Sequence, residues 1–268
     1  MITKQQLIDE IRAMGICPTD TVVIHTSMRA IGTVDGGADT VIDAFCEVLT
    51  DGLFVVPTHT WATVSPNHPF YDVRTAVPNI GALPCAAAKR EDGFRSLHPT
   101  HSMWAKGKGA EAFVAGEENA VSPTPPGFAW ARLGDVGAKI LLIGVGNNKN
   151  TFIHTVDELY DVPDRLSDTM YDVTVRGYDG REYTHPYHAH ACSRTCDVSQ
   201  YFVNFEDAFV ACGVQTFGRL GNADVRIVDA AKCRDTVLRI FQSAAADETR
   251  VDKDLCVSHL EIPKEYYQ

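Results

Sequence analysis

Short runs of β-branched and aliphatic residues alternate with amphipathic stretches along the first 145 residues of the chain. Apolar residues recur at helical spacing over 4–14 and 38–49, which end at Gly15 and at Asp51-Gly52. Three other apolar runs have the length of buried strands: 21–27 (TVVIHTS), 52–60 (GLFVVPTHT) and 139–146 (KILLIGVG). Alternating strands and helices predict an α/β core.

The pattern changes after residue 165. Residues 171–188 (YDVTVRGYDGREYTHPYH) alternate apolar and polar positions around Asp179-Gly180. An Asp-Gly pair between two alternating runs is typical of a tight hairpin turn. We therefore predict an antiparallel β insertion at about 168–190.

The last third of the chain returns to mixed patterns. Residues 204–213 have helical spacing that ends at Gly213, and 223–241 has a strand pattern followed by a helical one. The predicted fold is α/β, with a central sheet flanked by helices and the antiparallel β insertion in the second half. A single domain over residues 1–268 is expected.

The composition indicates a globular protein, since 45% of the residues are hydrophobic and 22% are charged. No apolar run approaches the roughly 18–20 residues that cross a bilayer. The first 15 residues have the pattern of an amphipathic helix rather than a signal peptide. We therefore predict a cytoplasmic protein without a membrane partner, either a monomer or a homodimer.

The net charge of −11 narrows the classes of partner. Nucleic acids and anionic membrane surfaces are bound by basic patches, so neither is expected here. Carboxylates in a cleft would instead attract a cationic ligand. Simple solubility explains the same charge, so the charge alone does not choose between these interpretations.

Histidines follow the three predicted strands. His25 ends the first run, His59 ends the second, and His154 lies shortly after the third. Ligands of open α/β sheets bind outside the carboxyl ends of the strands, so these histidines are expected at one edge. Imidazoles titrate near pH ~6.5, which suits them to acid–base chemistry.

His154 also has acidic neighbours on its own predicted helix. Asp157 lies three residues after it and Glu158 four residues after it. Residues three and four apart share one side of a helix, so either carboxylate could orient the imidazole. Spacing alone is equally typical of an ordinary surface pair.

A second histidine-rich stretch, 185–196 (HPYHAHACSRTC), is a candidate zinc site. Its metal-ligand types are His188, His190, Cys192 and Cys196. Structural zinc sites usually bring ligand pairs from two separate turns, whereas these four groups fall within nine residues. We therefore expect no metal. The signatures Gly-x-Ser-x-Gly and His-Glu-x-x-His are also absent from the sequence, which argues against an α/β-hydrolase and a zinc protease.

Four segments carry a family resemblance when they are taken in order: VVIHTSMRAIGTVDGG, DGLFVVPTHTW, NIGALPCAAAKREDGFRSLHPTHSMWAKG and KILLIGVGNNKNTFIHTVDEL. Together they resemble the aminoglycoside 3-N-acetyltransferases, an acetyl-CoA-dependent antibiotic-modifying family distinct from the Gcn5-related acetyltransferases. The four segments reach from about residue 20 to 165, and weaker similarity continues in the segment HACSRTCDVSQYFVNFEDAFVACGVQTFGRLGNADVRIVDA.

The resemblance implies a cofactor side of the site. It places the contacts to the pantetheine and phosphates of acetyl-CoA in the segment after the first strand, with Ser27, Met28 and Arg29 as the chief contacts. The full implied set is His25, Thr26, Ser27, Met28, Arg29, His98 and Ser102.

The resemblance also implies that His154 is the general base, which takes a proton from the amine as the amine attacks the acetyl thioester. The family pattern is His-x-x-Glu, whereas this chain has Asp157 at the acid position, followed at once by Glu158. Asp157 is favoured by its position in the pattern, and Glu158 by its longer reach.

The implied acceptor is an aminoglycoside, which is a polycation. Acids after His154, including Asp161 and Asp164, are candidates to attract it. The predicted acceptor-binding residues are His59, Asp161, His188 and His190. Three alternatives stay open: an acetyltransferase for another amino sugar or amine, a zinc-dependent hydrolase, and a non-catalytic CoA-binding protein.

Overall fold

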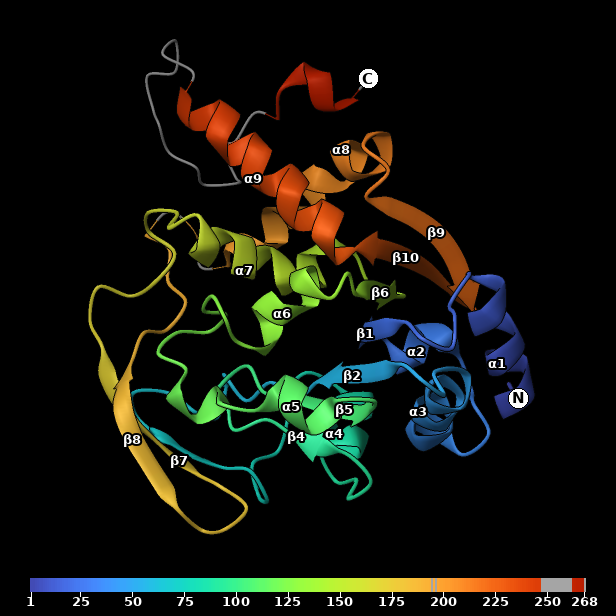
Figure 1. Cartoon of the computed structure of the whole chain (residues 1–268), viewed down its shortest axis with the longest axis horizontal. Coiled ribbons are helices and arrows are strands. Elements are labelled where there is room, and N and C mark those ends of the chain that lie inside the picture. Colours follow the sequence, from blue (N-terminus) through green and yellow to red (C-terminus); the bar gives the residue numbers. More distant parts are fainter. Residues whose placement is uncertain (194, 196, 247–261, 268) are drawn as a thin grey trace.

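A computed structural model describes residues 1–193, 195, 197–246 and 262–267. In this part of the chain a mixed, seven-stranded sheet lies at the centre of the molecule (Figure 1). Its spatial order is β4 (Phe94–Arg95), β5 (Met103–Gly107), β2 (Leu53–Pro57), β1 (Thr21–Thr26), β6 (Lys139–Ile143), β10 (Ala223–Asp229) and β9 (Gln215–Leu220). The predicted α/β class is confirmed.

The three strands predicted from continuous apolar runs form the middle of this sheet. β1 pairs in parallel with β2 on one side and with β6 on the other. The outer strands β5 and β10 are antiparallel to their neighbours. The carboxyl ends of β2, β1 and β6 therefore share one edge of the sheet.

Helices cover both faces of the sheet, which explains why the central strands are apolar at successive positions. One face packs against α1 (Lys4–Ala13), α3 (Gly37–Val48) and α4 (Ala82–Ala87), and the other against α5 (Ala110–Val114), α6 (Ala129–Asp135), α7 (Phe152–Leu159), α8 (Glu206–Ala211) and α9 (Ala230–Ala246) (Figure 1). Within β1, the side chains of Val22 and Ile24 lie in the core beneath α1, α3 and α4, and the side chain of Val23 lies in the core on the opposite face. Among the described residues, no helix is both long and apolar enough to cross a membrane.

The hairpin predicted in the second half consists of β7 (Tyr171–Arg176) and β8 (Glu182–Tyr187). β7 also pairs in parallel with β3 (Phe70–Asp72), so the hairpin belongs to a separate three-stranded sheet. This sheet has its own hydrophobic cluster, which includes Tyr71, Val173 and Tyr187. Gly180 has φ = 80° in the hairpin turn, a conformation that favours glycine.

The remaining described elements are short. They are α2 (Met28–Ile31) and the 3₁₀ helices η1 (Glu117–Asn119), η2 (Asn147–Lys149), η3 (Val198–Phe205) and η4 (Lys264–Tyr267). The helix predicted over 204–213 is therefore divided between the end of η3 and α8. The strand and helix predicted over 223–241 are confirmed as β10 and α9.

Candidate active site

A cavity of about 760 Å³ lies at the carboxyl edge of the central strands. His25 at the end of β1, His59 after β2 and His154 on α7 all line it. The strand order explains this meeting, because β2, β1 and β6 are parallel neighbours whose following segments leave the sheet at the same edge. The expectation that these three histidines share one edge is confirmed.

Further histidines join these three through ring contacts. His59 lies 4.6 Å from His101, between ring centroids, and His101 lies 5.2 Å from His190. His190 in turn lies 4.2 Å from His154. All four rings line the cavity.

Trp130 of α6 supports the deep end of this group. Its indole stacks on His25, at 5.8 Å between centroids, and meets the ring of His59 edge-on at 5.4 Å. The indole N–H donates to the carbonyl oxygen of His101 at 3.0 Å, which fixes the ring on a second element. The side chain of Trp130 is buried, so it provides a rigid floor for the imidazoles.

Burial keeps most of these imidazoles neutral. Desolvation lowers the pKa of His25 to about 3, with a smaller contribution from Lys149. Desolvation also holds the pKa of His59, His101 and His154 well below the ordinary histidine value. Neutral imidazoles at pH 7 can accept a proton from a bound substrate.

His154 lies beside the acid of the predicted pattern. Its Nδ1 is 3.5 Å from Oδ2 of Asp157, and the same oxygen accepts a hydrogen bond of 3.2 Å from Nε of Arg165. Both charged partners are almost fully buried, with side-chain exposures of 1% and 3%. Burial raises the pKa of Asp157 to about 6, although Arg165 opposes that rise.

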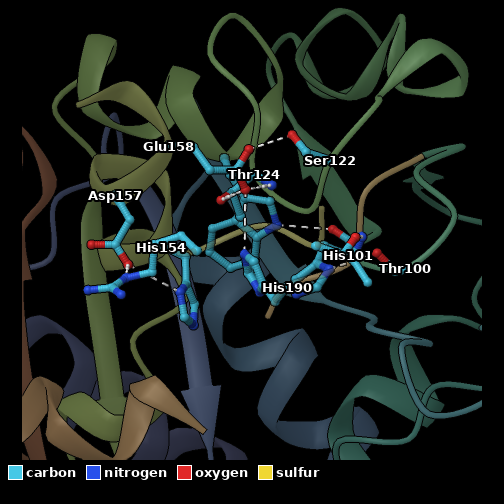
Figure 2. Close-up of polar contacts among 12 residues, drawn as sticks. Thr100, His101, Ser122, Thr124, His154, Asp157, Glu158 and His190 are labelled. Carbon is cyan, nitrogen blue, oxygen red and sulfur yellow. Dashed lines mark hydrogen bonds and ion pairs between the residues drawn. The ribbon is translucent and has the colours of Figure 1, made fainter. Parts of the chain in front are cut away.

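Glu158 points to a different group of residues (Figure 2). Its carboxylate accepts hydrogen bonds from the Ser122 hydroxyl, from the Thr124 backbone amide at 2.7 Å and from the Thr124 hydroxyl at 2.8 Å. It also lies 3.4 Å from Nε2 of His190. Of the two acids that the spacing leaves open, Asp157 is therefore the neighbour of His154, and Glu158 is the neighbour of His190.

Thr100 connects His101 to the small sheet. The Thr100 hydroxyl is 2.8 Å from Nδ1 of His101 and also makes a hydrogen bond with the hydroxyl of Tyr187 on β8. Burial raises the pKa of Tyr187 well above its usual value, although the contact with Thr100 opposes that rise, so the phenol stays protonated. The chain of hydroxyls thereby sets the orientation of the His101 ring.

His98 and Ser102 lie behind the cavity wall and are fully buried. Nδ1 of His98 accepts hydrogen bonds from the backbone amides of Thr100 and His101, at 3.2 and 2.9 Å. The Ser102 hydroxyl donates to the carbonyl oxygen of Thr58 at 2.8 Å. Both side chains are thus engaged in internal hydrogen bonds, and neither lines the cavity.

The segment after β1 is only partly in the cavity. His25 and Thr26 line it, whereas Ser27 caps α2, where its hydroxyl accepts from the Ala30 amide at 3.2 Å. Met28 packs partly against the core, and the side chain of Arg29 is exposed. None of Ser27, Met28 and Arg29 therefore lines the cavity.

The predicted acceptor-binding residues divide into two groups. His59 and His190 line the cavity, whereas Asp161 is exposed in the turn after α7 and does not line it. His188 also lies elsewhere, since its Nδ1 is 2.7 Å from the carbonyl oxygen of Ser167. Asp164, another acid expected near the acceptor, is exposed and accepts hydrogen bonds from Ser193.

Other polar residues of the wall escaped the sequence pattern. Lys149 and Asn150 follow β6, in the loop that the third strand predicts, and Asp197 comes from the segment before η3. Hydrogen bonds from Ser199 hold the pKa of Asp197 below its usual value, although partial burial opposes this. No local periodicity distinguishes these residues. Only Lys149 and Asn150 could have been predicted to line the site, because they follow a predicted strand.

The candidate zinc ligands do not form one cluster within the described residues. Cys196 lies outside them, and His188 and His190 contact Ser167 and Glu158 respectively. The Cys192 thiol is 3.5 Å from Oδ2 of Asp164. Among the residues that the structure describes, no three His, Cys, Asp or Glu side chains could hold a metal ion together.

Comparison with known proteins identifies the family of the chain. A family model described as aminoglycoside 3-N-acetyltransferase matches residues 23–242. Aminoglycoside N(3)-acetyltransferase VII of Streptomyces paromomycinus is 32% identical over 180 residues, which cover 60% of this chain and 62% of that protein. An aminoglycoside N(3)-acetyltransferase III from Salmonella is 28% identical, over 67% of this chain and 68% of its own. The chain thus spans less than two thirds of the Streptomyces relative.

Solved structures have the same fold as this chain. Aminoglycoside acetyltransferase AAC(3)-Xa superimposes with a TM-score of 0.76 and 28% identity, and the match covers 89% of this chain and 92% of that one. AAC-IIIb has a TM-score of 0.77 at 22% identity. The second likeness concerns the fold alone.

Proposed function

The chain belongs to the aminoglycoside 3-N-acetyltransferase family, and from this premise we propose that it transfers the acetyl group of acetyl-CoA to an amino group of an aminoglycoside. The observation that carries the proposal is the largely buried, neutral imidazole of His154 at the cavity wall, with the carboxylate of Asp157 behind it. Such a pair suits a base that must take a proton from an attacking amine.

In the proposed reaction the amine nitrogen attacks the carbonyl carbon of the thioester. The new C–N bond forms, the nitrogen gives a proton to His154, and the C–S bond breaks with its electron pair on sulfur. The CoA thiolate then takes the proton from His154 and leaves as the free thiol. Nδ1 of His154 faces Asp157, so Nε2 is the nitrogen available to the substrate. The carboxylate 3.5 Å away stabilises the imidazolium that results.

Unpartnered polar atoms in the cavity wall suit a large polar cosubstrate. Among the described residues, the Thr26 hydroxyl, Nε2 of His59 and Oδ1 of Asn150 are buried without a hydrogen-bond partner. A buried polar atom without a partner costs about 1–3 kcal/mol, which a bound ligand can recover. We assign these atoms to acetyl-CoA or the acceptor, and the exposed Arg29 to the CoA phosphates beyond the cavity.

His98 and Ser102 keep a role in this proposal as positioning residues. They hold the turn that presents His101 and Thr100 to the cavity. Their contribution to cofactor binding would therefore be indirect, through the shape of that turn.

The charge of the wall favours a second candidate acceptor, an amine with fewer positive charges than an aminoglycoside. Asp197 is the one carboxylate and Lys149 the one ammonium among the described lining residues. A polycation would find a single acid there, opposed by a lysine. The acids expected to attract it, Asp161 and Asp164, lie outside the wall.

Release of free thiol from acetyl-CoA tests both candidates. The wild-type protein is given aminoglycosides with and without a free 3-amino group, and a parallel set of simple amino sugars. Release confined to aminoglycosides with that amine establishes the first candidate, and release confined to amino sugars establishes the second. Silence with every amine contradicts the proposed activity.

Substitution of the base provides the second arm of the test. His154→Ala should reduce kcat by about 10²–10⁴-fold and leave CoA binding nearly unchanged. The matched control is His68→Ala, because His68 is exposed and lies outside the cavity. A wild-type rate in the His154→Ala variant would refute the assignment of the base.

A further inference from the structure

Two imidazole–carboxylate pairs lie side by side in the cavity, although the family pattern accounts for only one of them. Asp157 and Glu158 are consecutive on α7 and therefore project about 100° apart around the helix. Figure 2 shows Asp157 beside His154, and Glu158 directed toward Ser122, Thr124 and His190. The two rings are 4.2 Å apart between centroids and tilted by 34°.

We propose that His190, oriented by Glu158, is a second catalytic base, which takes the first proton from the acceptor's ammonium before His154 takes the second. The inference rests on the proposed acetyl transfer to an amine. It concerns a residue that otherwise would be expected only to contact the acceptor.

The surroundings of Glu158 favour its ionised form. Its side chain is only 4% exposed, and it accepts hydrogen bonds from Ser122 and from the amide and hydroxyl of Thr124. Burial opposes ionisation, but the contacts with His190, Ser122 and Thr124 hold the pKa of Glu158 below its usual value. This carboxylate is thus fixed in place as an acceptor.

An ionised carboxylate beside one ring nitrogen selects the tautomer of the ring. Nε2 of His190 is buried and lies 3.4 Å from Oε1 of Glu158, in ion-pair contact, and we therefore place the ring proton on this nitrogen. Nδ1 is then the nitrogen with a free lone pair. His190 lines the cavity and its side chain is 25% exposed although Nε2 is buried, and we assign this lone pair to the acceptor.

An ammonium acceptor must lose two protons from its nitrogen in the course of the reaction. An alkyl amine with a pKa near ~10 reaches the site as an ammonium, which has no lone pair for attack. One proton must leave before the C–N bond forms, and a second must leave the nitrogen after it has formed. His190 takes the first proton, and His154 takes the second and returns it to the departing CoA thiolate.

The spacing of the two rings orders these steps. Two imidazoliums about 4 Å apart repel each other strongly in a partly buried site. His190 must therefore release its proton to solvent before His154 becomes charged. The greater exposure of the His190 side chain, 25% against 12% for His154, gives it the better access to water.

Several titratable groups surround His190. They are Glu158, Asp157 and His154 on α7, His98 and His101 from the segment before β5, and His59 from the segment after β2, with Arg165 paired to Asp157. Glu158 is the group among them in ion-pair contact with the His190 ring, and burial keeps the four other histidines neutral.

The test is the pH profile of kcat/KM for His190→Gln. The loss should be about 10²-fold at pH 7 and should shrink below tenfold near pH 10, where the amine arrives already deprotonated. Glu158→Gln should show the same pH-dependent loss, because the neutral amide holds the Nε2 proton less strongly. The control is His185→Gln on β8, whose side chain lies outside the cavity.

Each outcome decides the proposal. An equal loss at every pH, with an unchanged KM for acetyl-CoA, would mean that His190 only supports the wall, and a wild-type profile would mean that it takes no proton; both overturn the second base. If His190→Gln does not fold, as judged by its thermal unfolding, His190→Asn replaces it with the same expectations. Absence of thiol release in the wild type overturns the proposed function, and the second base with it.

Discussion

The carboxylate of Glu117 accepts a hydrogen bond of 2.7 Å from the backbone amide of Ala129, at the first turn of the helix that carries Trp130. Glu117 is fully buried, and burial raises its pKa to about 7, although the bond from Ala129 opposes the rise. The folded protein therefore holds this proton more tightly than the unfolded chain, whose glutamates titrate near ~4.3.

Glu117→Gln should remove this source of pH dependence. In the wild type the stabilisation from the protonated acid is complete below pH ~4.3 and is lost as the pH rises through 7, a difference of about 3 kcal/mol. Denaturant unfolding at pH 5 and pH 8.5 measures it. The wild type should lose up to about 3 kcal/mol more than the variant across this interval, and equal losses in both proteins would contradict the buried acid.

Arg165 is predicted to stabilise the folded protein because its charge neutralises the buried carboxylate of Asp157. Removal of one partner of a buried ion pair costs about 3–5 kcal/mol, so Arg165→Met should destabilise the protein strongly at pH 8. The loss should be smaller at pH 5, since the pKa of Asp157 is about 6 and the acid is then protonated.

A second substitution distinguishes the charge from the packing. Asp157→Asn combined with Arg165→Met removes both charges, and the double variant should be more stable at pH 8 than Arg165→Met alone. If the double variant is no more stable, the guanidinium matters for its other contacts.

Arg29→Ala should raise the KM for acetyl-CoA about tenfold and leave kcat nearly unchanged, because a charge-assisted bond to a phosphate contributes about 1.5–3 kcal/mol. Arg29 is exposed, so added salt should reduce the difference between variant and wild type. Steady-state kinetics at two ionic strengths checks this. Arg181→Ala, at the exposed hairpin turn, is the control, and an unchanged KM for Arg29→Ala would remove Arg29 from the cofactor site.

Arg95→Lys is predicted to destabilise the fold by about 2–4 kcal/mol. The buried guanidinium donates to the Thr58 hydroxyl and carbonyl and to the carbonyl oxygens of Val73 and Ala76, at 2.6–3.3 Å. A lysine ammonium cannot reproduce this planar set of donors. Thermal unfolding measures the loss, and a melting temperature within one degree of the wild type would contradict it.

The middle of the fold could be predicted from the sequence because β1, β2 and β6 are buried on both faces. Their apolar residues are consecutive, which is the pattern of strands covered on both faces. β9 was not predicted from the sequence because it is an edge strand with exposed positions, including Phe217. β5 was not predicted because its last two residues, Lys106-Gly107, have the composition of a loop.

The site was partly predictable for a similar reason. His25, His59 and His154 follow strands, so their meeting is a consequence of strand order. The pairing of His190 with Glu158 joins positions 32 residues apart, on a helix and after a hairpin. The contact forms only because the three-stranded sheet packs beside the central one, so the spacing of residues along the sequence cannot predict it.

The cavity is lined by residues from the central sheet and from the small sheet, and this has an evolutionary consequence. α7 follows the central sheet, whereas Tyr187 and the segment to His190 continue from the hairpin, whose core is a separate hydrophobic cluster. Insertions at the exposed hairpin turn, Asp179-Gly180, can accumulate without disturbing either core. A one-residue slip in β8 would instead turn Tyr187 away from Thr100. The length of the turn is therefore free to change, whereas the base of the hairpin, which lines the cavity, stays under constraint.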